Sequence, residues 1–160
     1  MDELIEQFLI EGRELVQQAS DDLLALEENP SDAGRIDSAF RAVHTLKGSV
    51  GFFDFAPMGE LLHRAEDLLG AIRDGRMTAA GPIIDVLLDC IGASDTWIDS
   101  IERTGALPPD ADALGRGLRA VMAWPASASS TASRLRATRL ATQYRSVSGA
   151  VTAFWPVLPR

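Results

Sequence analysis

One histidine in this chain lies beside a lysine and a glycine at spacings that a helix gathers on one face. In the segment Phe40–Ser49, Lys47 follows His44 by three residues and Gly48 follows it by four. Helical positions three and four apart are neighbours on the surface. Glycine inside a helix costs about 1 kcal/mol relative to alanine, so this glycine suggests a surface that is kept bare. An imidazole flanked by a cation on a bare, rigid helix suits a nucleophile that another protein must reach.

A second histidine precedes a glutamate by three residues further along the chain, at His63 and Glu66. If the two helical segments are antiparallel neighbours, Glu66 can approach His44. A carboxylate that accepts the imidazole Nδ1–H fixes the tautomer and leaves Nε2 free as the nucleophile. The alternative is a surface pair between His63 and Glu66, worth a few tenths of a kcal/mol.

The stripe that carries His44 also contains Arg41, Gly48 and Gly51, and we expect these three residues to frame a docking surface for a partner protein. Close helix packing is the alternative for the two glycines. Lys47 lies between this stripe and the core, where its stem can pack and its ammonium could neutralise a phosphate carried by His44. The alternative is that Lys47 is an ordinary solvated charge.

A resemblance to a known family rests on the segments AFRAVHTLKGSVGFF and LLHRAEDLLGAIRDGRM, and it extends from about Glu3 to Val121. The chain resembles the histidine-phosphotransfer (HPt) domain of CheA-type chemotaxis histidine kinases. The resemblance implies a phosphoacceptor at His44, with Glu66 orienting its ring and His63 near the site. It also implies that the phosphate comes from ATP through a kinase domain and passes to an aspartate of a CheY-like or CheB-like response-regulator receiver.

The composition favours helices, because 46% of the 160 residues are hydrophobic and only 6% are aromatic. The charge is uneven along the chain. Residues 1–124 hold all 23 acidic side chains and ten basic ones, a net charge of −13, whereas residues 125–160 hold five arginines and no acid. An acidic body argues against nucleic acid as a partner.

Apolar residues at helical spacing predict five helices. They are expected over about 3–28, from the caps at 29–32 to about Gly51, from Pro57 to a stop at Gly75, from about Ala79 to Thr104, and from the end of the segment 108–110 to about Ala123. Short connections favour an all-α, up-down antiparallel four-helix bundle with an additional short C-terminal helix. We expect the bundle to occupy residues 1–124 and residues 125–160, rich in Ser, Thr, Ala and Arg, to form a linker or disordered tail.

The single cysteine, Cys90, excludes an internal disulfide and fits a reducing compartment. The acidic, amphipathic start of the chain lacks the basic and apolar regions of a secretory signal. No run of apolar residues is long enough to span a membrane. These observations together predict a cytoplasmic location.

The sequence contains neither a G-x-x-x-x-G-K-[ST] loop nor a G-x-G-x-x-G motif. Without a nucleotide site the domain is not expected to be an enzyme by itself or to bind a cofactor. ATP, on a kinase domain in cis or in trans, and Mg²⁺, on the kinase or the receiver, are expected to come with the partners. A free-standing HPt protein of a multistep phosphorelay and a non-catalytic helical interaction bundle remain as alternatives. A metal site or a hydrolase would need ligands or a nucleophile elbow that the chain does not offer.

Overall fold

The computed structural model describes residues 3–122, which form five α-helices and no strands. The helices are α1 (Glu3–Glu28), α2 (Ala33–Val50), α3 (Ala56–Arg73), α4 (Gly81–Thr104) and α5 (Ala111–Met122). The prediction of an all-α protein with a short fifth helix is confirmed. The largest differences in helix bounds are that α4 starts at Gly81, two residues later than expected, and that α3 ends at Arg73, two residues before Gly75. The predicted linker at 125–160 lies outside the described residues.

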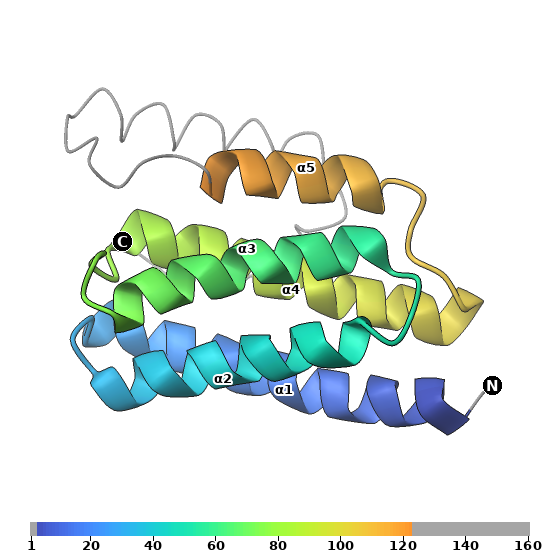
Figure 1. Ribbon diagram of the computed structural model, residues 1–160, viewed down its shortest axis with the longest axis horizontal. Coiled ribbons are helices and arrows are strands. Elements are labelled where there is room, and N and C mark those ends of the chain that lie inside the picture. The colour runs from blue at the N-terminus through green and yellow to red at the C-terminus, as the bar shows by residue number, and fades with distance from the viewer. Residues whose placement is uncertain (1–2, 123–160) are drawn as a thin grey trace, which may run out of the picture.

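The first four helices alternate in direction and form the predicted up-down bundle (Figure 1). α1 packs against α2 and α4, and α2 packs against α3. α5 lies along the outside of α3 and also touches α4. Within the described residues the backbones of α2 and α4 do not approach each other, so α2 has α1 and α3 as its direct neighbours and keeps an outer face.

Local sequence signals set the ends of the helices. The Asp32 side chain caps α2 by accepting the Arg35 backbone N–H at 3.1 Å. Gly75 and Gly105 follow the ends of α3 and α4 with φ near +74° and +73°, in the left-handed region that glycine adopts without strain. These short turns hold neighbouring helices antiparallel.

One continuous apolar core joins the five helices. Its largest fully buried side chains are Trp97, Leu23, Leu26, Leu46, Met58, Leu61, Leu62, Leu69, Ile84, Leu87, Ile98 and Ile101. The apolar spacing of the second helix predicts a buried stripe made of Ile36, Ala39, Phe40, Val43, Leu46 and Val50. For Phe40 this prediction is wrong, because its side chain is only half-buried, whereas Ala42 is buried. Leu4, which shares the helical spacing of the first helix, is 64% exposed, because the 26-residue α1 extends past the end of the 18-residue α2.

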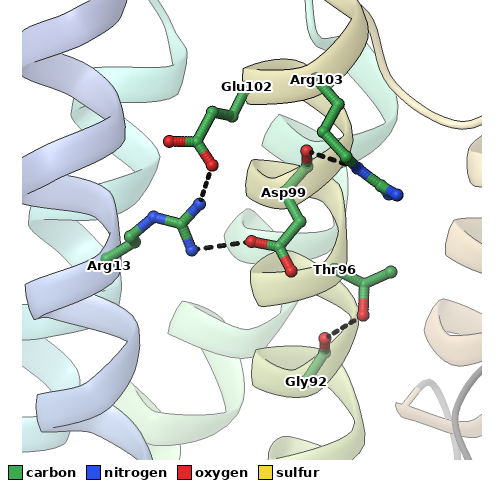
Figure 2. A network of polar contacts seen from close by, with 6 residues as sticks. All are labelled: Arg13, Gly92, Thr96, Asp99, Glu102 and Arg103. Atoms are coloured by element: carbon green, nitrogen blue, oxygen red, sulfur yellow. Dashed lines mark hydrogen bonds and ion pairs between the residues drawn. The ribbon is translucent and has the colours of Figure 1, made fainter.

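A polar network on the surface ties α1 to α4 (Figure 2). Arg13 reaches across from α1 and donates to Asp99 at 2.7 Å and to Glu102 at 2.6 Å. Because these side chains are 38–53% exposed, the network contributes modestly to stability and mainly fixes which face of α1 meets α4.

Candidate functional site

The antiparallel pairing of α2 and α3 brings their polar residues together in register. Because the two helices are antiparallel, a residue later in α2 lies opposite a residue earlier in α3. The paired positions are Asp37 with Arg73, Phe40 with Gly70, His44 with Glu66, and Val50 with Gly59. The condition under which Glu66 was expected to approach His44 is therefore met.

His44 and Lys47 both approach the same carboxylate oxygen of Glu66. The Nδ1 atom of His44 lies 3.2 Å from Oε2 of Glu66, and the Nζ atom of Lys47 lies 2.8 Å from the same oxygen. Both approaches are off the directions of an ideal hydrogen bond, so we describe the Lys47 contact as an ion pair and the His44 contact as a close polar contact. The His44 side chain is 61% exposed, whereas that of Glu66 is 16% exposed. The imidazole thus faces solvent while its Nδ1 edge is held against a shielded carboxylate.

The Glu66 carboxylate is held in its ionised form. Its burial raises the pKa, but the close approach of Lys47 and His44 outweighs burial and brings the pKa of Glu66 below its ordinary value. The sequence predicted that the Lys47 ammonium lies where it can reach a phosphoryl group carried by His44. The structure shows that, without phosphate, this ammonium rests on Glu66.

A second contact to the imidazole comes from Phe40, one helical turn before His44. The two rings are stacked, with centroids 6.0 Å apart and planes inclined by 15°. The guanidinium carbon of Arg73, from α3, lies 3.8 Å from the centroid of the Phe40 ring. Sequence reasoning missed this arrangement, although the four-residue spacing of Phe40 and His44 was a signal that the rings share a helix face.

The other predicted site residues with side chains lie around the centre without touching it. Arg41 donates to Asp37 at 2.7 Å on its own helix. His63 has its Nε2 atom 3.9 Å from Asp67 rather than paired with Glu66. Among the described residues neither Arg41 nor His63 forms a hydrogen bond or ion pair with His44, and the polar neighbour of His63 is Asp67 on the same helix.

The two predicted glycines differ in their surroundings. Gly48 is exposed, and a Cβ atom built there would meet nothing within 4 Å. Close helix packing therefore does not explain Gly48. Gly51 caps α2, and a Cβ there would approach the Gly48 carbonyl oxygen at 3.2 Å. Ser49 turns its hydroxyl to the Thr45 carbonyl at 3.2 Å.

In the part of the chain that the structure describes, no three His, Cys, Asp or Glu side chains group as a metal site would require. Nor does any described helix combine the length and apolarity needed to cross a membrane. Cys90 is a free, fully buried cysteine, and its burial raises the pKa of its thiol.

Comparison with protein families gives a match between residues 3–97 and the model of the Hpt domain. Among curated proteins, the chain is 34% identical over 122 residues to the chemotaxis protein CheA of Halobacterium salinarum, covering 76% of this chain and 18% of that protein. It is 37% identical over 106 residues to the sensor histidine kinase CheAY of Helicobacter pylori, covering 66% of this chain and 13% of that protein. The chain thus spans less than a fifth of the length of these relatives.

Two solved structures share the fold. The phosphorylated P1 domain of CheA3 from R. sphaeroides, in complex with CheY6, aligns with a TM-score of 0.68 and 27% identity, covering 77% of this chain and 98% of that chain. The CheA phosphotransferase domain from Thermotoga maritima aligns with a TM-score of 0.60 and 32% identity, covering 64% of this chain and 99% of that chain.

Proposed function

The chain belongs to the Hpt domain family, and from this membership we propose that it is the phosphotransfer module of a CheA-type chemotaxis histidine kinase. His44 accepts a phosphoryl group from ATP bound to a kinase domain and passes it to an aspartate of a response-regulator receiver. The observation that carries the proposal is the exposed imidazole of His44 with its Nδ1 atom 3.2 Å from the Glu66 carboxylate.

The first transfer uses the lone pair of Nε2. With the Nδ1 proton directed at Glu66, Nε2 is unprotonated and attacks the γ-phosphorus of ATP, so that an N–P bond forms and the bond to ADP breaks. Positive charge develops on the ring in this step, and the ionised Glu66 stabilises it. The proposed role of Glu66 is thus to orient the ring and to balance its charge.

Lys47 is proposed to neutralise the incoming phosphoryl group. Its ammonium lies 2.8 Å from Glu66, and its side chain is only 27% exposed, so its stem is held while its charged end stays beside the imidazole. An ammonium with three donors can keep a contact to the carboxylate and add one to a phosphoryl oxygen.

In the second transfer an aspartate oxygen of the receiver attacks the phosphorus, the N–P bond breaks, and the neutral imidazole is restored. The bare surface at Gly48 leaves room for the receiver, and Arg41 and Gly51 border it. The phosphorylated P1 domain bound to CheY6 is the related structure that supports a receiver as the partner.

ATP and Mg²⁺ are proposed to enter with the partners, ATP on the kinase domain and Mg²⁺ on the kinase or the receiver. The module by itself is then a phosphorylated relay substrate and not a turnover enzyme. A cytoplasmic location completes the proposal, because the phosphoryl donor is ATP.

The test is transfer of radiolabelled phosphate from ATP to this chain by a CheA kinase core that lacks its own Hpt domain, followed by a chase with receiver proteins. We expect an acid-labile, base-stable label that is lost to a receiver within seconds. A kinase core that labels its own Hpt domain but never this chain, across a panel of such cores, would favour a bundle that only binds partners.

A further inference from the structure

The Nδ1 contact with Glu66 holds the His44 imidazole at one edge only. A side chain that is 61% exposed and held at one atom can still swing about that contact, and Nε2 would then sweep through a range of directions. In-line attack on phosphorus needs the reacting atoms about 3–3.5 Å apart and aligned. A nucleophile on an open surface therefore needs a second restraint.

Phe40 provides such a second restraint by stacking against the imidazole ring. Its ring lies nearly parallel to the imidazole, inclined by 15° with the centroids 6.0 Å apart, which is within the range of attractive ring pairs. The contact acts on the ring face, whereas Glu66 acts at Nδ1. An edge contact and a face contact together limit both the direction of Nε2 and the tilt of the ring.

The Phe40 ring is itself held by α3. Arg73 places its guanidinium carbon 3.8 Å from the ring centroid, a cation–π geometry. At Gly70 a Cβ atom would already lie 3.5 Å from Cε2 of Phe40, so the ring fills the space that a larger side chain would occupy. Arg73 also lies 4.0 Å from Asp37 of α2 and 3.9 Å from Asp74 at the end of α3, so its charged group has acidic neighbours on both helices.

From these contacts we propose that Phe40, held by Arg73, is a positioning residue for His44 and keeps Nε2 directed toward the partner. This inference rests on the proposed function of His44. Arg73 touches neither His44 nor Glu66 among the described contacts and acts through Phe40. Phe40 exchanges no proton or phosphoryl group, and its role is to set the orientation of the imidazole ring.

The test compares Phe40→Leu, which keeps an apolar side chain but removes the aromatic face, with Phe40→Tyr, which keeps the ring. Two measurements are made on each chain. Nuclear magnetic resonance reports cross-relaxation between the two rings and the tautomer of His44 without any partner. Labelling kinetics with a CheA kinase core separate kcat from the KM for this chain.

We expect Phe40→Leu to shift the His44 ring from one tautomer and orientation to an averaged mixture. Labelling should slow at least about fivefold in kcat with KM within about twofold of wild type, since misplacement of a reacting group acts on the chemical step. Phe40→Tyr should restore both properties. Arg73→Gln should reproduce part of the defect, whereas Arg76→Gln, an exposed arginine nearby in the chain that pairs with Asp74, should not.

The variant Ile36→Val tests whether a loss of stability alone could cause the defect of Phe40→Leu, because it shortens a buried side chain one turn before Phe40. This variant should lower thermal stability without changing the His44 tautomer or kcat. Unchanged ring signals in Phe40→Leu, or averaged ring signals with an unchanged kcat, would overturn the positioning role. Absence of label on the wild-type chain would instead overturn the proposed function, and the ring signals would still decide whether Phe40 orients His44.

Discussion

Glu66 of α3 places one carboxylate oxygen 3.2 Å from the Nδ1 atom of His44 on α2, and the two side chains differ fourfold in exposure, 16% against 61%. A shielded carboxylate interacts more strongly with its partners than an exposed one, because less water screens it. An exposed imidazole remains open to another protein. The pair therefore combines a reachable nucleophile with a charge partner that solvent does not weaken.

Replacing His44 by glutamine should abolish phosphorylation and leave the fold intact. The side chain is mostly exposed, so its loss removes no core packing, and exposed substitutions of this kind change stability by about 0.5 kcal/mol or less. His63→Gln is the matched control, since His63 is also exposed and pairs with Asp67. Radiolabelling and thermal unfolding of both variants check the prediction. Acid-labile label persisting on His44→Gln would place the phosphoacceptor elsewhere.

Glu66→Gln should slow labelling about 10- to 100-fold, by analogy with the loss of a carboxylate partner from a metal-binding histidine. The amide keeps the shape of the side chain but cannot balance the positive charge of the ring. The Nδ1-protonated tautomer of His44 should also lose its dominance, which nitrogen chemical shifts report. A labelling rate equal to wild type would remove Glu66 from the mechanism.

The stability of the wild-type chain should fall on acidification in a way that Glu66→Gln does not. The pKa of Glu66 is lowered in the folded state from an ordinary value of 4.5, because Lys47 and His44 outweigh the effect of burial. A lowered pKa contributes stability that is fully present above pH 4.5 and is lost as the pH falls through the folded-state value. Urea unfolding at pH 7 and below pH 4 should show the two chains differing at neutral pH and converging in acid.

Asp95 should show the opposite pH dependence. The carboxyl group of this exposed residue loses part of its hydration in the fold, and this loss, followed by the charge of nearby Asp99, raises its pKa above the ordinary 3.8, which Arg13 only partly opposes. A raised pKa in the folded state means that the ionised carboxylate destabilises the fold at neutral pH. Asp95→Asn should therefore stabilise the chain at pH 7, by less than about 1 kcal/mol for an exposed group. The gain should vanish below pH 3.8 in the same urea series; a gain that persists in acid would rule out this origin.

The bundle could be predicted from the sequence because its helices carry strong periodic signals and clear ends. Gly75 and Gly105 mark two of those ends through a left-handed backbone that other residues adopt at a cost. Periodicity describes one helix at a time, however, and it does not report relative helix lengths. The exposure of Leu4 follows from α1 being longer than α2 and could not be predicted from the stripe alone.

For the candidate site, too, the sequence predicted which helices meet but not the details of their packing. The meeting of His44 with Glu66 was expected on the condition that α2 and α3 are antiparallel neighbours, and this condition holds. The contact between Lys47 and Glu66 depends on the axial register of the two helices, which the sequence pattern leaves free. The half-burial of Phe40 depends on the same register, because it places Gly70 opposite the ring.

Gly48→Ala should make the chain more stable and a poorer phosphotransfer partner. A Cβ atom at this position meets nothing within 4 Å, so the helix gains about 0.5–1 kcal/mol without strain. The same atom stands one turn from His44, on the surface that a receiver must approach. Transfer to the receiver should therefore slow, and Gly48→Leu should slow it further, because a larger side chain stands between the two surfaces.

Gly92 offers the matched control for Gly48. It lies within α4, a Cβ there also meets nothing within 4 Å, and the backbone of α4 is not adjacent to that of α2 among the described residues. Gly92→Ala should give the same gain in stability with wild-type transfer rates. Stopped-flow transfer kinetics and urea unfolding on the two variants separate the effects. Equal transfer rates in Gly48→Leu and wild type would show that the partner approaches His44 from another side, because a side chain in its path could not be neutral.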